Sequence, residues 1–164
     1  MERQLLRIVG VDPGTKVCGY GAIETDGDDV RVLDFGVVKK MSGSLPERLM
    51  ALHRGLSAVF ARCGPDVVVV EGAFYGKNAR TALAMGEARG MVLLTAAQSG
   101  AEVVEYAPKV AKKSVVGSGR ADKSQVQRMV RVILNLPELP EPPDASDALA
   151  LAICHYHRVG SALP

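Results

Sequence analysis

The stretch IVGVDPGTKVCGYG, residues 8–21, decides the fold because it joins a buried strand to a turn and a second strand. Its first residues, Ile-Val-Gly-Val, predict a strand in the core, and this strand runs directly into Asp12. Pro13 and Gly14 then turn the chain. A lone carboxylate at the end of a core strand costs on the order of a few kcal/mol unless another group, an ion or water pairs with it. The rest of the chain must therefore supply a partner for Asp12.

The length and composition of the chain predict a single globular domain that spans residues 1–164. The length suits one domain and is short for two, and the 48% of apolar residues is typical of globular proteins. No apolar run approaches the roughly 18 residues of a membrane span, and the first residues lack the long apolar segment of a secretory signal. The three cysteines are far apart, as expected for free thiols in a reducing compartment. We therefore expect a cytoplasmic protein that does not contact membranes.

The formal net charge of +2 is unevenly distributed along the chain. The window from Lys109 to Arg131 contains seven basic residues and one acidic residue, so it carries +6 while the remainder carries −4. This asymmetry is typical of proteins with a polyanionic partner. A solvated, lysine-rich loop and helix explains it equally well.

Hydrophobic periodicity predicts an α/β fold with a central mixed five-stranded sheet and helices on both faces. Turn residues separate the first three strands, which indicates an antiparallel meander. The apolar run Val67–Val70 is typical of a parallel strand buried on both faces. The expected strands are 5–11, 17–24, 30–38, 66–71 and 102–106. The expected helices are 45–62, 78–98, 122–135 and 145–158.

The second predicted helix carries small residues at Ala82, Gly86 and Gly90. A row with this spacing lets another backbone approach the helix closely. The chain's own sheet and a second subunit are both possible partners, and the spacing alone favours the sheet.

Two predicted core strands each end in a carboxylate, Asp12 and Glu71. In open sheets, functional sites gather at the carboxyl ends of the strands. If both strands run in the same direction, the two carboxylates lie at the same edge of the sheet.

Two further acids occur in EPPDASDALALAICHYH, residues 141–157. Asp144 and Asp147 are three residues apart, so a helix places them on one face. The apolar residues that follow predict a buried helix, whose first turn then lies near the sheet. Taken alone, these acids are better explained by helix capping, because Asp144 is a good N-cap residue and an acid in the first turn suits the helix dipole.

Four carboxylates on ordered elements favour a metal site over capping. If they converge, they cannot all remain ionised without cations. Hard oxygen ligands suit Mg²⁺ or Mn²⁺ rather than zinc. Two such ions about 3.5–4 Å apart can stabilise the attacking and leaving oxygens of a phosphoryl transfer. Together with the basic window, the residues predict a metal-dependent nuclease.

These motifs resemble the RuvC family of bacterial Holliday junction resolvases, crossover junction endodeoxyribonucleases with a ribonuclease H-like fold. The resemblance extends from Ile8 to His157 and keeps the order of the motifs. It is carried by the stretch quoted above and by three others, VVVVEGAFYGKNARTALAMGEARG, EYAPKVAKKSVVGSGRADKSQVQRMV and PPDASDALALAICHYH.

The resemblance implies an enzyme that nicks two opposing strands of a four-way DNA junction symmetrically, in recombination and repair. The products would carry 5′-phosphate and 3′-hydroxyl ends, and each subunit of a homodimer would hold two Mg²⁺ ions, with Mn²⁺ able to substitute. Branch-migration proteins of the same pathway are the implied partners. The positions that match the family's catalytic and metal-binding acids are Asp12, Glu71, Asp144 and Asp147. The positions that match its DNA contacts are Phe74, Lys112 and Lys123.

The resemblance also implies that the helix over 78–98 belongs to the subunit interface. On this interpretation, the row Ala82, Gly86 and Gly90 contacts a second subunit rather than the chain's own sheet.

Three other functions fit parts of the sequence. Actin-like and sugar-kinase ATPases also place an Asp-x-Gly-Thr turn after a strand, as in Asp12–Thr15, but they need two such halves. A junction-binding module without catalysis needs no acid cluster. A relative of the same fold that cuts RNA differs only in its substrate, and DNA is favoured through the resemblance.

Overall fold

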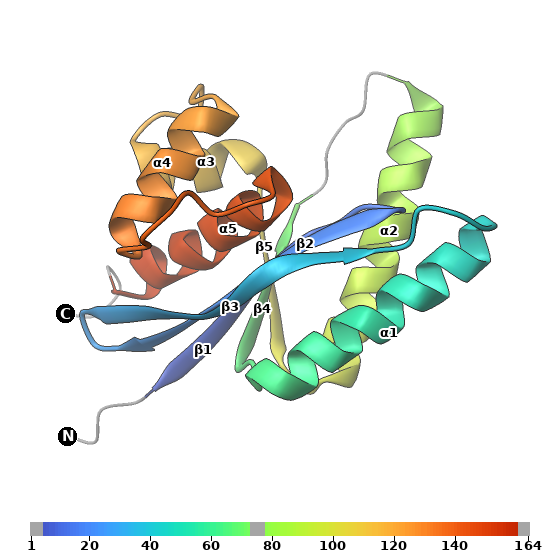
Figure 1. Cartoon of the computed structure of the whole chain (residues 1–164), viewed down its shortest axis with the longest axis horizontal. Helices are drawn as coiled ribbons and strands as arrows, with labels where there is room; N and C mark the ends of the chain where they lie inside the picture. The colour runs from blue at the N-terminus through green and yellow to red at the C-terminus, as the bar shows by residue number, and fades with distance from the viewer. Residues whose placement is uncertain (1–4, 73–77, 161–164) are drawn as a thin grey trace.

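The computed structural model describes residues 5–72 and 78–160, and Figure 1 shows their arrangement. A five-stranded sheet has the order β3-β2-β1-β4-β5. The first three strands form an antiparallel meander, and β4 and β5 run parallel to β1. The strands are β1 (Leu6–Asp12), β2 (Val17–Asp26), β3 (Asp29–Lys39), β4 (Val67–Glu71) and β5 (Glu102–Tyr106).

Helices cover both faces of the sheet (Figure 1). On one face lie α1 (Leu45–Cys63) and α2 (Ala79–Gln98). On the other face lie α3 (Pro108–Val116), α4 (Lys123–Ile133) and α5 (Pro143–Gly160). The predicted mixed five-stranded sheet with helices on both faces is confirmed. None of the helices in the described part of the chain is both long and apolar enough to cross a membrane.

The helix α3 was missed because its sequence carries little apolar signal. Only Ala111 and Val115 of its nine residues are buried, and its lysines are typical of an exposed loop. Its ends do carry helix signals, since Pro108 is the first helical residue and Gly117 ends the helix in the left-handed conformation, with φ 87°.

The central strands β1 and β4 are buried on both faces because successive side chains enter different cores. On one face, Ile8, Val67 and Val69 pack with the residues of α3, α4 and α5. On the other face, Val9 and Val68 pack with α1 and α2. This explains why both strands are continuous apolar runs until they end in carboxylates.

Glycines allow α5 to lie directly on β1 and β2. A Cβ atom at Gly10 would stand 1.9 Å from the carbonyl oxygen of Ala148, and one at Gly19 would stand 2.1 Å from that of Asp144. Both obstacles are backbone atoms of the helix, which no side-chain rotation can move. The contact between α5 and the sheet therefore requires glycine at these positions.

The row of small residues on α2 does not pack on the sheet. A Cβ atom at Gly86 or Gly90 would meet no atom of the described residues within 4 Å. The buried residues of α2 are on another face of the helix, namely Ala88, Val92, Thr95 and Ala96. The interpretation that spacing alone favoured is therefore wrong, and the row is open to a second chain.

Gly10→Ala is expected to destabilise the protein by about 3 kcal/mol, the upper end of the usual cost of overpacking, because the added methyl group must displace the α5 backbone. Urea denaturation followed by circular dichroism measures the loss. Gly36→Ala is the matched control in the same sheet, since its nearest neighbour would be the Tyr20 hydroxyl at 3.1 Å rather than helix backbone, and it should cost less than Gly10→Ala. Equal stability of Gly10→Ala and wild type would contradict the close packing of α5 on β1.

Candidate active site

The carboxylates of Asp12 and Glu71 meet at the carboxyl ends of β1 and β4. The parallel register pairs Val11 with Val70, so the next residue of each strand lies at the same edge of the sheet. The two carboxyl groups interact electrostatically, since burial and, after it, the negative charge of Glu71 raise the pKa of Asp12. The sequence-based prediction that the two strands present their acids together is thus confirmed by their pairing.

The first turn of α5 brings two more acids to this edge. In the sheet, Asp12 is paired with Gly19, and Gly19 is the residue on which the backbone of Asp144 rests. One carboxylate oxygen from each of Asp12, Asp144 and Asp147 lies within 4.8 Å of the others. Within the described residues this trio has the spacing of a metal site, and Glu71 lines the same cavity from the end of the neighbouring strand β4.

The capping explanation for Asp144 does not hold. The helix α5 begins at Pro143, so Asp144 lies inside its first turn rather than at the cap position. Its negative charge still suits the helix dipole there.

Burial and mutual repulsion make full ionisation of these acids unfavourable. Burial, followed by the negative charges of Glu71, Asp147 and Asp144, raises the pKa of Asp12 to about 8. Burial also raises the pKa values of Glu71 and Asp147 above their ordinary values. The site therefore favours a proton or a cation, which answers the question that Asp12 raised in the sequence.

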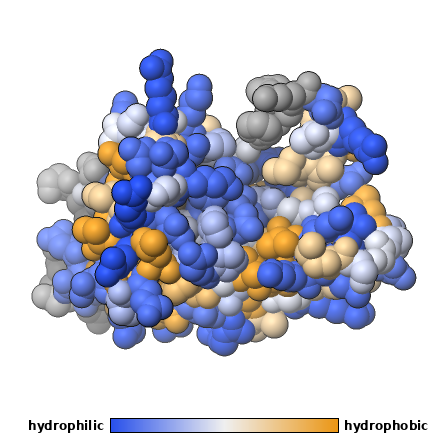
Figure 2. All heavy atoms as spheres, turned by 45° about the horizontal axis from the view of Figure 1, so that its top comes forward, coloured by the Kyte–Doolittle hydropathy of each residue, from blue (hydrophilic) through white to orange (hydrophobic). Residues whose placement is uncertain are grey.

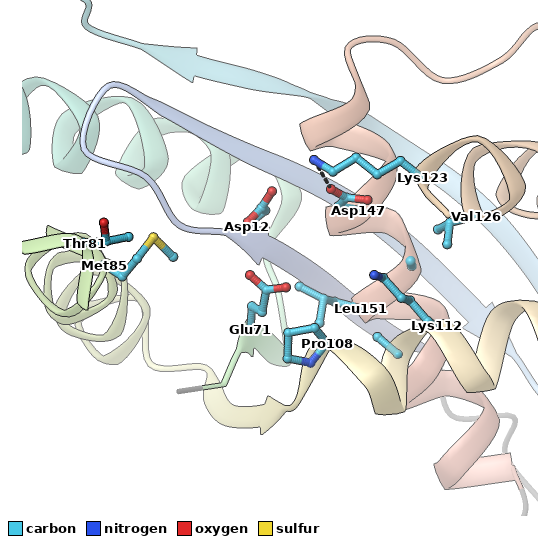
Figure 3. A pocket seen from close by; sticks show the side chains of 12 residues that line it. Asp12, Glu71, Thr81, Met85, Pro108, Lys112, Lys123, Val126, Asp147 and Leu151 are labelled. Carbon is cyan, nitrogen blue, oxygen red and sulfur yellow. Dashed lines mark ion pairs between the residues drawn. The ribbon is translucent and has the colours of Figure 1, made fainter. Parts of the chain in front are cut away.

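A cavity of about 390 Å³ opens beside the acids, between the two layers of helices (Figure 3). Asp12, Glu71 and Asp147 lie along it, and the side chains of Lys112 from α3 and Lys123 from α4 reach it from one side. The ammonium nitrogen of Lys123 is 3.5 Å from a carboxylate oxygen of Asp147. The basic window thus delivers two of its cations to the acid cluster.

Other residues complete the cavity without having been predicted. Thr81 and Met85 line it from α2, on the side opposite the lysines, and Pro108, Val126 and Leu151 form apolar parts of its wall (Figure 3). No local pattern distinguishes these residues from ordinary helix residues, and only the packing of α2 against β4 places them there. Phe74, predicted as a DNA contact, lies outside the described residues.

The donor set fits a hard divalent cation. The cluster offers carboxylate oxygens and no nitrogen or sulfur ligand, which is the chemistry that Mg²⁺ and Mn²⁺ prefer. Carboxylates at the ends of central strands, faced by lysines across an open cavity, define a nuclease of the ribonuclease H-like class.

Comparison with known proteins identifies the family. The family model described as Crossover junction endodeoxyribonuclease RuvC matches residues 8–155, and this chain belongs to that family. The crossover junction endodeoxyribonuclease RuvC of Chloroflexus aggregans is 49% identical over 151 residues, covering 92% of both chains. That of Pelotomaculum thermopropionicum is 50% identical over the same length and coverage. The chain is accordingly an endonuclease, which excludes the ATPase and the purely binding module.

Solved structures agree with this assignment. A Thermus thermophilus RuvC in complex with a Holliday junction substrate has a TM-score of 0.86 at 36% identity, with 97% of this chain and 99% of that chain covered. The yeast mitochondrial Holliday junction resolvase has a TM-score of 0.64 at 14% identity, covering 95% of this chain and 83% of that chain, so it shares the fold.

The raised pKa of Asp12 predicts a pH-dependent stability. Between about pH 4 and pH 8 the folded protein holds a proton on Asp12 that the unfolded protein releases, so without divalent metal the free energy of unfolding falls as pH rises through this window. Asp12→Asn removes this pH-dependent contribution to the free energy of unfolding, because asparagine does not titrate. Its Tm should therefore exceed that of wild type increasingly towards pH 8, and Mg²⁺ should raise the Tm of wild type more than that of the variant.

Asp28→Asn is the control, because it removes the same charge at an exposed turn. Differential scanning calorimetry at several pH values compares the three proteins. Parallel Tm curves for wild type and Asp12→Asn would mean that the Asp12 pKa is not raised by its surroundings.

Proposed function

We propose that this protein resolves four-way DNA junctions by nicking two opposing strands symmetrically. The observation that carries the proposal is the meeting of Asp12, Asp144 and Asp147 within 4.8 Å beside a cavity that Lys112 and Lys123 line. Family membership supports the junction as substrate, since a relative with 36% identity is described in complex with one. The process served would be recombination and repair of DNA in the cytoplasm.

Asp12, Glu71, Asp144 and Asp147 would hold the catalytic metal, proposed to be two Mg²⁺ ions per subunit, with Mn²⁺ as a substitute. Bound metal of this kind supplies a water of lowered pKa and neutralises charge on the oxygens of the phosphate. The carboxylates themselves orient the bound group, because they project from two strands and one helix that are fixed in the core. Hydrolysis would leave 5′-phosphate and 3′-hydroxyl ends that a ligase can rejoin.

Lys112 and Lys123 are proposed to bind the phosphate that is cut and to offset its developing charge. Both side chains enter the cavity from the lobe formed by α3 and α4 (Figure 3). In Figure 2, hydrophilic residues cover much of this lobe. Residues 109–131, which form most of it, contain seven basic residues and one acidic residue, as expected for a surface that faces a polyanion. Phe74 is proposed to stack on a base near the exchange point, an interaction worth about 1–3 kcal/mol per base.

A homodimer would supply the two active sites that symmetric nicking requires, because a two-fold axis relates two equivalent strands. We place its interface on α1 and α2. Gly86 and Gly90 leave room there for a second backbone, and a groove between the two helices is flanked by exposed apolar side chains such as Leu94 and Met50. Branch-migration proteins are the proposed partners of the assembled dimer.

A cleavage assay tests the proposed function. With Mg²⁺, a mobile four-way DNA junction should receive paired nicks in opposing strands, while a linear duplex of the same sequences and an RNA–DNA hybrid remain uncut. Asp12→Asn should bind the junction with unchanged affinity and cleave it at least about 1,000-fold more slowly, because several kcal/mol of charge stabilisation are lost.

Asp28→Asn serves as the control and should cleave like wild type, since its carboxylate is exposed and distant from the cluster in the fold. Loss of binding in Asp12→Asn would argue for a structural role of Asp12. Cleavage of the hybrid in preference to the junction would favour the RNA-cutting alternative.

Leu94→Glu should weaken the dimer, because the side chain is 58% exposed in one chain and would bring a charge into the proposed interface. Sedimentation velocity should give a dissociation constant raised at least about tenfold. Val132→Glu is the control on α4, where the side chain is 68% exposed and lies on the opposite face of the sheet. Equal dissociation constants for both variants would rule out this face as the interface.

A further inference from the structure

A second group of basic residues gathers at the turn that follows Asp12. The ladder between β2 and β3 pairs Val17 with Lys39, and the amide of Lys40 donates to the carbonyl of Lys16 at 2.8 Å. Lys16 and Lys40 therefore stand opposite each other at the end of the ribbon. The guanidinium of Arg48, from the first turn of α1, joins them through a 3.0 Å bond from Nε to the carbonyl of Thr15. We name Lys16, Lys39, Lys40 and Arg48 the turn cluster. Lys39 lies on the other face of the ribbon from Lys16 and Lys40, because successive residues of a strand alternate between faces.

The positive charge of the turn cluster is only partly compensated. Within residues 5–72 and 78–160, none of its four members makes an ion pair with a carboxylate within 4 Å. The nearest acid in the sequence is Glu47, whose side chain accepts a 2.7 Å bond from the amide of Ser44 in the cap of α1. The bonds with Ser44 and, to a lesser extent, the charge of Lys40 hold the pKa of Glu47 below its ordinary value, so this one carboxylate offsets part of the charge of the four basic residues. Like charges that stand opposite in a ladder are destabilising, so an anion bound here would relieve a repulsion.

The turn cluster is held at a fixed position relative to Asp12. Lys16 is only four residues from Asp12, and the turn between them is tight, because a Cβ atom at Gly14 would lie 2.1 Å from the carbonyl of Val17. The thiol of Cys18 donates to the carbonyl of Gly14 at 3.2 Å. Arg48 also donates from Nη1 to the carbonyl of Gly43 at 2.8 Å, which ties the turn to the loop after β3.

The turn lies across the active site from the two cavity lysines. In Figure 3 the chain leaves Asp12 on the side away from Lys112 and Lys123, turns, and returns as β2. Lys16 and Lys39 are exposed, so their ammonium groups are available to a ligand. Positive charge therefore flanks the acid cluster on two sides.

We propose that the turn cluster binds backbone phosphates of the cleaved strand on the far side of the scissile phosphate from Lys112 and Lys123. This inference rests on the proposed function and adds a second anchoring site to it. Phosphates follow one another closely along a DNA strand. When the scissile phosphate lies at the acids, further phosphates of the same strand therefore lie on both sides of it. Two anchors fix the direction of the strand through the site, which a single anchor leaves free to pivot.

Salt dependence of binding tests the proposal. Junction affinity of the full-length protein is measured with a chelator at several salt concentrations, for wild type and for Lys16→Gln/Lys39→Gln/Lys40→Gln. The slope of log affinity against log salt should fall by about one for each lysine that contacts a phosphate. Arg62→Gln is the control, because it removes an exposed charge at the opposite end of α1 from Arg48. An unchanged slope in the triple variant would overturn the proposal.

Neutral methylphosphonate linkages in the junction locate the contact. Placed on one flank of the scissile phosphate, they should weaken binding of wild type and have little effect on the triple variant, while those on the other flank weaken both proteins equally. Equal effects on both flanks in both proteins would also overturn the proposal. Failure of wild type to cut any four-way junction would instead refute the proposed function. Circular dichroism verifies that the triple variant is folded.

Discussion

The close contact between α5 and the strands β1 and β2 is the constraint on which the site depends. Glycine at positions 10 and 19 lets the helix backbone rest on the sheet, and Gly19 is the ladder partner of Asp12. Any side chain at position 19 would lift the first turn of α5, and with it Asp144 and Asp147, away from the carboxylate of β1. Packing of backbone on backbone therefore sets the spacing of the acids, and the spacing determines what they can bind.

The same packing destabilises the folded protein when no cation is bound at the site. Burial disfavours the charged form of these carboxylates and they repel one another, and both effects raise the pKa of Asp12. The two cores on either side of the sheet compensate, because β1 and β4 are anchored by apolar contacts on both faces. Binding of a cation, as proposed, would relieve the repulsion between these carboxylates, and the neighbouring lysines would attract phosphate to the cavity.

Much of the fold and the acid cluster followed from the sequence, because apolar runs that end in carboxylates report both burial and chemistry. The helix α3 was missed because only Ala111 and Val115 are buried in it. The spacing of Gly86 and Gly90 favoured packing of this row on the sheet. Such spacing indicates that another backbone approaches the helix closely, but it does not identify which backbone. Thr81 and Met85 could not be found at all, because their position in the cavity depends on how separate elements pack.

The ion pair between Lys123 and Asp147 makes the lysine a resident counterion of the acid cluster. A lysine on a flexible stem exchanges easily, because its charge is not tied to one geometry as that of an arginine is. In the proposed function, a divalent ion that binds Asp147 would displace the ammonium group of Lys123, which would then be available to a phosphate of the substrate. Metal binding by the acids and phosphate binding by Lys123 would thereby be linked through one side chain, so the proposed enzyme would lack one of its contacts to DNA when it holds no metal.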